Sequence, residues 1–465
     1  MRLSFDRGTL LLTGDGVSHE QLSGIFDSGT WTWDGRAPGW RCDAYRYFDV
    51  RKRLRQHVRA GWIDAIPPPA KVTWPQLNLL PLRPEQAHAV GAWRDSDGRG
   101  QVVMPTGTGK TEVALEIMAK CAVATLVVAP VRDLMYQWHQ RILRRLGYDA
   151  GIVGDSTYNL RDITVTTYDS ASIHMAEIGA RFGLVVFDEA HHLPGNFYRE
   201  AALLNSAPFR LGLTATPERS DGRHADLDWL IGPVAYRQQI SEAKGRTLAD
   251  YNVVRIPVAL NAEEQACYEY ASQAVRTFIY ERQKAEPGYT WKKLCEESGT
   301  YPEARRVQKL YFAKQAIENR AEEKLRVLED IFRLHGGERV IVFAGSNLMA
   351  LDVSRRFLVP TLLSHSRKKE RLAVLEGFAE GRFPAIVANQ VLDEGVDVPA
   401  AKVAVVIGGM GSTRQAKQRL GRILRRSGHA RATLYEVVCE NTKDEARSRD
   451  RRRSDAYERT LHRRL

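Results

Sequence analysis

Cysteine is scarce in this sequence, and long apolar runs are absent from it. Its 465 residues include five cysteines, which are scattered and form no C-x-x-C pair. That spacing argues against a zinc ribbon, an iron–sulfur cluster and a disulfide framework, and it favours a reducing compartment. No apolar run approaches the roughly 18 residues that a membrane span needs, and Leu10–Leu12 is too short for the core of a signal peptide. We therefore expect a cytoplasmic chain with no membrane partner.

The overall composition is that of a globular protein, with 43% hydrophobic and 27% charged residues. At roughly 150 residues per domain, the length predicts about three domains. Lysine and arginine number 68 against 56 aspartates and glutamates, which gives a formal net charge of +12. This excess favours a polyanionic partner but does not say which one.

Residues 1–78 form a first predicted unit that is rich in tryptophan. Short apolar alternations predict strands, and Val50, Leu54 and Val58 recur at helical spacing. The opposite face of that helix is basic, which suits either solvent or DNA. Most tryptophans of so small a domain belong to its core, and Pro67–Pro69 predicts a stiff linker. The tryptophans of this unit are Trp31, Trp33, Trp40, Trp62 and Trp74.

The rest of the chain predicts two α/β domains, 79–240 and 241–465. In each, short apolar runs alternate with helical stretches, a pattern typical of parallel sheets covered by helices on both faces. A charged helical block at about 263–335 interrupts this alternation near the start of the second domain. The predicted strands are 101–104, 125–129, 163–166, 184–187 and 211–214, then 340–343, 361–363, 385–388, 403–407 and 433–438. The last stretch, 443–465, predicts a surface helix or a loose tail.

A glycine-rich turn lies between a predicted strand and a predicted helix at 112–120. Its backbone N–H groups and the helix N-terminus suit a phosphate, Lys110 suits the β- and γ-phosphates, and Thr111 offers Mg²⁺ a hydroxyl. Met104 stands where the general pattern has a small residue. The alternative, a turn with a surface lysine, leaves the strand–loop–helix context unexplained. The predicted phosphate-binding loop comprises Thr106, Gly107, Thr108, Gly109, Lys110 and Thr111.

Two carboxylates, Asp188 and Glu189, follow the apolar run 184–187. Such a pair is costly at a strand end unless a cation or a proton transfer uses it. We expect Asp188 to hold Mg²⁺ through water and Glu189 to orient and deprotonate the attacking water. The alternatives are a simple turn acid pair, or a metal site built on His191 and its neighbour, for which further ligands at suitable spacing are lacking.

Two further segments complete the predicted site. Thr214 and Thr216 end another strand and could relay the state of a nucleotide. Far downstream, Gln418, Arg422 and Arg425 fall on one helical face, and the arginines suit a γ-phosphate reached from a facing domain. A basic surface helix is the alternative for this last segment.

Taken in order, these segments resemble a superfamily 2 helicase over nearly the whole chain. The resemblance implies two RecA-like domains, with ATP and Mg²⁺ as cofactors. It implies ATP contacts by Arg83, Gln86, the phosphate-binding loop, Gly395 and Asp397, coupling by His191, Thr214 and Thr216, and Mg²⁺ ligation by Thr111 and Asp188. It implies nucleic-acid contacts by Arg132, Thr166, Thr167, Tyr168 and Arg414.

Within this superfamily the sequence is most similar to the XPB (xeroderma pigmentosum group B) helicases of the short prokaryotic type. The similarity rests on the segment 411–425, on a helical thumb insertion at about 263–322, and on a damage-recognition-like domain at 1–78. It implies a nucleoid-associated 3′→5′ DNA helicase or translocase in repair, acting on single-stranded or forked DNA, with a nuclease partner. Ser220 replaces the glutamate of an Arg-Glu-Asp element, which puts damage-coupled unwinding in doubt.

Other functions stay open from the residues alone. An RNA helicase, or a duplex DNA translocase that does not separate strands, would keep the same motor. A DNA-binding scaffold with a decayed ATPase fold would not need the charged residues of the predicted site.

Overall fold

A computed structural model of the chain describes residues 1–465 except 15–16, 59–60, 220, 240–241, 243–250, 364–365, 390–400, 409–431, 453–459 and 463–465. The chain divides into two compact units, Met1–Gln239 and Ile240–Leu465. As predicted, each of them contains a largely parallel sheet with helices packed against it. In the part of the chain that is described, no helix combines the length and the apolar character needed to cross a bilayer.

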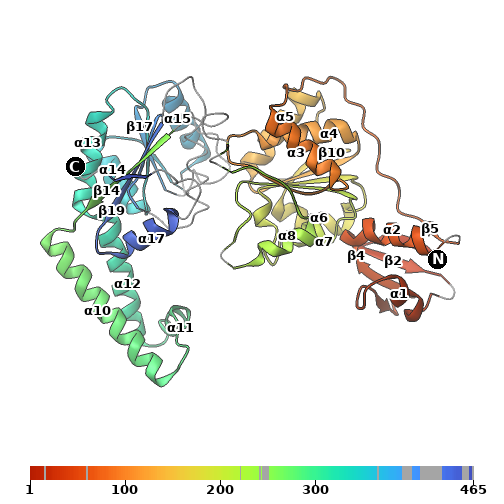
Figure 1. Ribbon diagram of the computed structural model, residues 1–465, viewed down its shortest axis with the longest axis horizontal. Coiled ribbons are helices and arrows are strands. Elements are labelled where there is room, and N and C mark those ends of the chain that lie inside the picture. Colours follow the sequence, from red (N-terminus) through yellow and green to blue (C-terminus); the bar gives the residue numbers. More distant parts are fainter. Residues whose placement is uncertain are drawn as a thin grey trace. The chain divides into compact units, whose positions relative to one another are not determined.

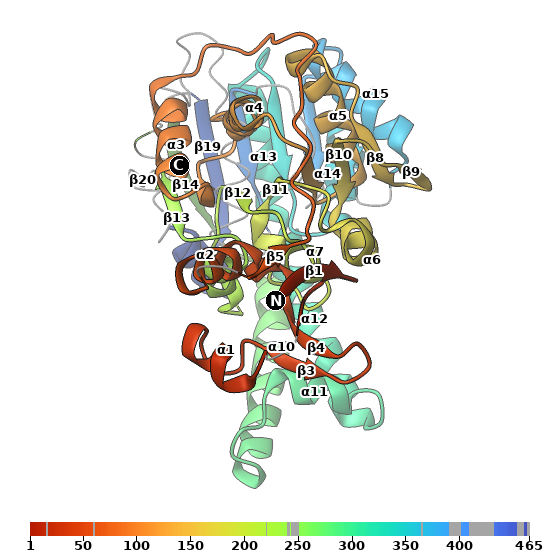
Figure 2. The same ribbon diagram turned by 90° about the vertical axis from the view of Figure 1, so that its right-hand side faces the viewer.

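The N-terminal domain is a small five-stranded sheet of order β3-β4-β2-β1-β5 with helices α1 and α2 packed on it (Figure 2). Leu22 of α1 and Val50 and Leu54 of α2 share one core with Leu3 and Leu10 of the strands. Trp33 is 53% exposed, whereas Trp31 is buried. The elements are β1 (Arg2–Asp6), β2 (Thr9–Thr13), α1 (His19–Ile25), β3 (Thr32–Asp34), β4 (Gly39–Asp43), η1 (Ala44–Arg46), α2 (Tyr47–His57) and β5 (Ile63–Asp64).

The core contacts of residues 66–74 place the boundary between this domain and the next one near the predicted proline linker. Ile66 belongs to the core of the small domain, whereas Val72 lies in the core of the following domain and Trp74 packs against that core. The indole of Trp74 also donates a hydrogen bond to the main chain of Ala119 at 3.1 Å. These contacts favour a boundary closer to Pro67–Pro69 than to residue 78.

The first large domain has an eight-stranded sheet of order β13-β6-β12-β11-β7-β10-β8-β9, parallel except for β9. Its strands carry apolar residues on both faces: Val127 packs under α3, α4 and α5, and Val128 packs under α6, α7 and α8. Its elements are α3 (Pro84–Asp95), β6 (Arg99–Val103), α4 (Lys110–Cys121), β7 (Thr125–Ala129), α5 (Arg132–Leu146), β8 (Gly151–Gly154), β9 (Thr157–Asn159), β10 (Ile163–Thr167), α6 (Tyr168–Ile178), β11 (Leu184–Asp188), η2 (Ala190–His192), α7 (Glu200–Leu203), β12 (Phe209–Thr214), η3 (Arg223–Ala225), α8 (Asp226–Leu230) and β13 (Val234–Arg237).

The second unit has a parallel sheet of order β16-β17-β15-β18-β19-β14-β20. The predicted strands of this unit are confirmed, and β14 and β20 are additional. Its elements are β14 (Tyr251–Val258), α10 (Ala262–Ala285), α11 (Trp291–Glu297), α12 (Pro302–Arg320), α13 (Glu322–Leu334), β15 (Val340–Phe343), α14 (Asn347–Phe357), β16 (Thr361–Leu362), α15 (Lys368–Ala379), β17 (Ala385–Ala388), β18 (Val403–Val406), β19 (Ala432–Cys439), α17 (Lys443–Arg452) and β20 (Thr460–His462).

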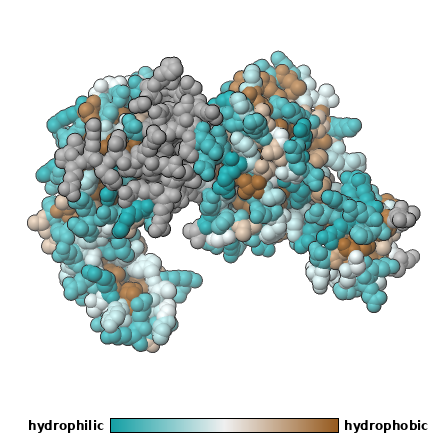
Figure 3. All heavy atoms as spheres, viewed as in Figure 1, coloured by the Kyte–Doolittle hydropathy of each residue, from teal (hydrophilic) through white to brown (hydrophobic). Residues whose placement is uncertain are grey.

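The predicted helical thumb consists of α10, α11 and α12. Helices α10 and α12 lie side by side and project from the second sheet (Figure 1). A capping box between Asn261 and Glu264 starts α10, and Pro302 starts α12 at a position where its missing N–H costs nothing. The visible face of the thumb is largely hydrophilic, with a small apolar patch towards its far end (Figure 3).

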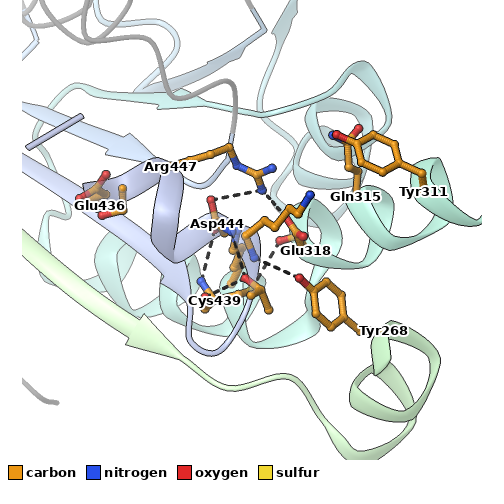
Figure 4. A network of polar contacts seen from close by, with 12 residues as sticks. Tyr268, Tyr311, Gln315, Glu318, Glu436, Cys439, Asp444 and Arg447 are labelled. Carbon is orange, nitrogen blue, oxygen red and sulfur yellow. Dashed lines mark hydrogen bonds and ion pairs between the residues drawn. The ribbon is translucent and has the colours of Figure 1, made fainter. Parts of the chain in front are cut away.

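A buried polar network joins the base of the thumb to the C-terminal helix (Figure 4). The ammonium of Lys324 on α13 lies 2.7 Å from the carboxylate of Asp444 on α17, and both side chains are fully buried. Arg447 on α17 pairs with the buried Glu318 on α12, and Tyr268 on α10 accepts a hydrogen bond from the main chain at Lys443. The start of α17 is therefore an anchored element rather than a loose tail.

Candidate ATP site

The predicted site residues of the first unit gather at one edge of its sheet. Strands β6, β12 and β11 are neighbours, and their register sets Val103 beside Thr214 and Asp188 beside Leu213. Because the strands are parallel, the loops that follow them leave from the same edge. This topology brings the phosphate-binding loop, the acid pair and the two threonines together.

The phosphate-binding loop has the backbone that its glycines predict. Gly107 and Gly109 have φ angles of 86° and 84°, a region that other residues rarely adopt. Lys110 begins α4, is almost buried, and donates a hydrogen bond to the carbonyl of Met104 at 3.1 Å. Met104, the departure from the general pattern, packs its side chain into the domain core, so its size leaves the loop unobstructed.

Arg83 and Gln86, at the start of α3, hold the loop from outside. The Gln86 amide donates to the carbonyl of Thr108 at 3.0 Å, and the Arg83 guanidinium donates to the same oxygen at 2.6 Å. Gln86 also lies so close to Gly109 that a side chain there would collide with it. Both residues thus contact the loop, and their contact with an adenine base stays a prediction.

The acid pair has an unusual geometry. Burial, with Glu189 beside it, raises the pKa of Asp188 to about 6. One Asp188 oxygen accepts from the main-chain N–H of Glu189 at 3.0 Å, and the other accepts from the indole of Trp138 at 2.8 Å. Glu189 itself has φ 47° and ψ 54°, a left-handed conformation that is costly for a side-chain-bearing residue. Such strain is typical of functional sites and is invisible in a sequence pattern.

The three predicted coupling residues form a connected set. His191 is fully buried, and its Nδ1 lies 3.0 Å from the hydroxyl of Thr214 and 3.5 Å from the carboxylate of Glu189. The same hydroxyl accepts a hydrogen bond from the main chain of Thr216 at 3.2 Å. Arg219 donates to the carbonyl of His191 at 2.8 Å, which ties the segment after β12 to the acid pair.

Two residues of α5 reach this site although no sequence motif includes them. Trp138 contacts Asp188 as described, and Arg141 donates to the hydroxyl of Thr111 at 2.8 Å. Helical spacing marks Trp138 as a core residue together with Met135 and Ile142, and it is one. Its second role needs the three-dimensional contact to be seen.

The predicted nucleic-acid residues divide into two groups. Arg132 is 70% exposed and pairs with Asp155 at 2.7 Å. Thr166, Thr167 and Tyr168 are buried. The hydroxyl of Tyr168 donates to the carbonyl of Asp188 at 3.0 Å. Their side chains are thus engaged inside the domain, and the structure does not support direct side-chain contacts from these three to a nucleic acid.

Several predicted residues lie outside the described part of the chain. Arg219 and Asp221, which flank one of them, form an ion pair at 2.6 Å that holds the pKa of Asp221 well below its usual value. The residues outside the described part are Ser220, Gly395, Asp397, Arg414, Gln418, Arg422 and Arg425.

The side chains of the site suit a magnesium–nucleotide complex. Mg²⁺ prefers oxygen ligands such as the carboxylate of Asp188 and the hydroxyl of Thr111. The Thr106 hydroxyl and one oxygen of Glu189 are buried and have no hydrogen-bond partner among the described residues. Buried polar atoms of this kind are normally satisfied, so a nucleotide or water would complete them.

Comparison with known proteins agrees with this geometry. Residues 3–58 match the xeroderma pigmentosum group B helicase damage recognition domain, residues 79–219 match the type III restriction enzyme res subunit, and residues 300–455 match the ERCC3/RAD25/XPB C-terminal helicase. The chain is 39% identical over 424 residues to the DNA 3′-5′ translocase XPB2 of Sulfurisphaera tokodaii, covering 90% of this chain and 95% of that one. The chain belongs to the XPB family of superfamily 2 DNA helicases.

Another XPB relative is longer than this chain. The DNA 3′-5′ helicase XPB of Kineococcus radiotolerans is 31% identical over 387 residues, which cover 80% of this chain and 62% of the relative. The chain therefore spans less than two thirds of that protein.

Solved structures support the helicase fold. The Pyrococcus furiosus Hef helicase domain matches with a TM-score of 0.52 and 18% identity, over 79% of this chain and 98% of that one. Saccharomyces cerevisiae Dbp5 bound to RNA and ADP BeF3 matches with a TM-score of 0.56 and 14% identity, over 82% and 89% of the two chains. At these identities the likeness concerns the fold alone, which is that of two RecA-like domains.

Proposed function

We propose that this chain is an ATP-dependent 3′→5′ DNA translocase of the XPB family that unwinds or remodels DNA in repair. The observation that carries the proposal is the convergence of Lys110, which follows β6, with Asp188 and Glu189 at the end of β11, at one edge of the sheet in which β12 lies between these two strands. The names of the relatives from Sulfurisphaera and Kineococcus support the 3′→5′ direction. Unwinding of RNA and translocation on duplex DNA without strand separation are the competing activities.

The chemistry follows from the side chains. Lys110 would neutralise the β- and γ-phosphates once a nucleotide replaces its bond to the Met104 carbonyl. Asp188 and Thr111 would hold Mg²⁺, which supplies charge neutralisation at the phosphates when it is bound. Glu189 would orient the attacking water and accept its proton.

The second RecA-like domain would complete this site. We propose that Arg422 and Arg425 approach the γ-phosphate, with Gln418, Gly395 and Asp397 near the nucleotide. His191, Thr214 and Thr216 would relay the nucleotide state, and Arg414 with Arg132 would contact the DNA backbone.

The remaining assignments also rest on family likeness. We propose an N-terminal damage-recognition-like domain, predicted at 1–78 but ending near Pro67–Pro69 by its contacts. A first helicase domain follows it up to residue 240, and a second at 241–465 carries the thumb at about 263–322. Forked or single-stranded DNA, a nuclease partner and a cytoplasmic, nucleoid-associated location complete the proposal.

Directional translocation is the test of this function. We expect strand displacement from a partial duplex with a 3′ single-stranded overhang and little from its 5′ counterpart. Displacement of RNA duplexes alone would refute the assignment to DNA. ATP turnover that DNA stimulates, without displacement of any strand, would favour the duplex translocase instead.

Lys110→Ala is expected to lower ATP turnover on the order of 10²–10³-fold, because it removes the cation that faces the transferred phosphate. The measurement is phosphate release at saturating ATP with single-stranded DNA present. Lys120→Ala, on the exposed end of the same helix, serves as the control. Equal turnover in Lys110→Ala and the parent would mean that the loop is not the phosphate site.

Arg132→Gln is expected to weaken DNA binding and to flatten its dependence on salt. Loss of one phosphate contact reduces the slope of log affinity against log salt concentration by about 0.7–0.9. Fluorescence anisotropy at several salt concentrations gives this slope. Arg144→Gln, exposed at the other end of α5, should leave it unchanged. An unaltered slope in Arg132→Gln would remove this residue from the DNA track.

A further inference from the structure

Helix α5 carries contacts to two separate sites of the first unit. It begins at Arg132, the proposed DNA contact, and it packs beside α4, which carries Lys110 and Thr111 (Figure 1). Its buried face lies in the same core as the central strands. A helix so firmly packed moves as one body, so a shift at one end reaches the other.

At the ATP end, Trp138 fixes the orientation of Asp188. The indole is only 2% exposed, and its N–H donates at 2.8 Å to one carboxylate oxygen. The other oxygen accepts from the main chain of Glu189. With both oxygens engaged, the direction in which this carboxylate faces a metal depends on where α5 stands.

One turn further along α5, Arg141 holds Thr111. Its guanidinium donates at 2.8 Å to the threonine hydroxyl. Residues three apart lie on one face of a helix, so Trp138 and Arg141 together reach the carboxylate and the hydroxyl that are proposed as magnesium ligands. Among the described residues, α5 is the helix whose side chains donate hydrogen bonds to both of these proposed ligands.

At the DNA end, the first turn of α5 is held by an anion of the protein itself. Asp155, in the turn between β8 and β9, pairs with Arg132 at 2.7 Å and accepts from the hydroxyl of Tyr136 at 2.9 Å. A DNA phosphate at Arg132 would compete with this carboxylate. Such an exposed ion pair contributes only about 0–1 kcal/mol, so a DNA phosphate can readily replace Asp155 as the partner of Arg132. The replacement would release Arg132, in the first turn of α5, from the turn between β8 and β9.

We propose that Trp138 and Arg141 are positioning residues through which α5 couples DNA contact at Arg132 to the proposed magnesium ligands Asp188 and Thr111. The inference rests on the proposed function, because it needs DNA at one end of the helix and a magnesium–nucleotide complex at the other. Coupling of this kind is a difference in nucleotide affinity between the free and DNA-bound protein, and it is reciprocal.

The test is a binding measurement on the full chain. The dissociation constant of a fluorescent, non-hydrolysable ATP analogue with Mg²⁺ is measured without DNA and with saturating single-stranded DNA. We expect DNA to change it on the order of tenfold in the parent. Trp138→Phe keeps an aromatic ring, smaller than the indole, but lacks the N–H. This variant and Arg141→Gln should each bring the ratio to within about twofold of 1.

Arg144→Gln is the matched control, since it removes a charge from an exposed position of the same helix, and it should keep the parent ratio. Arg141→Gln is the second variant in case Trp138→Phe folds poorly. Parent-like ratios in both Trp138→Phe and Arg141→Gln would overturn the inference and leave the proposed function standing. A parent whose ATP turnover does not respond to DNA at all would overturn both.

Discussion

Glu189→Gln should lower ATP turnover by about 10²–10⁴-fold, the contribution typical of a positioned general base. The amide has the size of the carboxylate but cannot accept the proton of the attacking water. Glu189 lies close to His191, with 3.5 Å between carboxylate and ring nitrogen, and it has a buried oxygen with no hydrogen-bond partner in the described part of the chain. Nucleotide affinity should stay within a few-fold of the parent value. Phosphate release and equilibrium binding of an ATP analogue measure the two effects.

The control for this variant is Glu177→Gln, an exposed glutamate on α6, which should turn over ATP like the parent. Normal turnover in Glu189→Gln would mean that Glu189 is not the base. Loss of nucleotide binding together with turnover would instead indicate that the carboxylate holds the strained turn after β11 in place.

Lys324→Met should destabilise the second unit by about 3–5 kcal/mol, because it removes the closer countercharge of a buried carboxylate. The ammonium of Lys324 and the carboxylate of Asp444 are 2.7 Å apart and fully buried. A second cation, Arg447, lies 3.7 Å from that carboxylate and is already paired with Glu318. The double variant Lys324→Met/Asp444→Leu should recover much of the loss, since two apolar groups can replace a buried ion pair. Hydrogen exchange across a urea series, read on peptides from β19 and α13, reports the free energy of unfolding of this unit alone.

Arg326→Met, two residues along α13, provides the matched control. Its guanidinium pairs with Glu322 at 3.1 Å on an exposed surface, so its loss should cost less than about 1 kcal/mol. A cost of this small size for Lys324→Met would show that the buried network does not anchor the thumb base to α17.

The strands of the two large sheets are predictable from the sequence because the apolar runs of buried parallel strands are nearly continuous. The predicted strand at 125–129 is β7 to the residue, and the acid pair lies at the end of β11, as the sequence predicts. The sheet edge that gathers the ATP site follows from parallel topology, so it too was predictable. Sequence spacing does not tell which loop side chains touch within that edge.

Contacts between distant residues were not predictable. Trp138 and Asp188 are 50 residues apart, and Lys324 and Asp444 are 120 apart. Its local sequence pattern explains Trp138 as a core residue and Lys324 as a surface charge. Which distant residue each of them contacts depends on how the helices and strands pack. Thr166, Thr167 and Tyr168 illustrate the same limit, because a motif places them near a nucleic acid while the fold buries their side chains.

The most direct test of the account is ATP turnover measured with single-stranded, duplex and forked DNA and with RNA of matched sequence. DNA, above all single-stranded or forked DNA, is expected to stimulate turnover, and salt is expected to weaken the stimulation because the protein contacts the phosphates. Absence of ATP turnover with every nucleic acid, or stimulation by RNA alone, would contradict it.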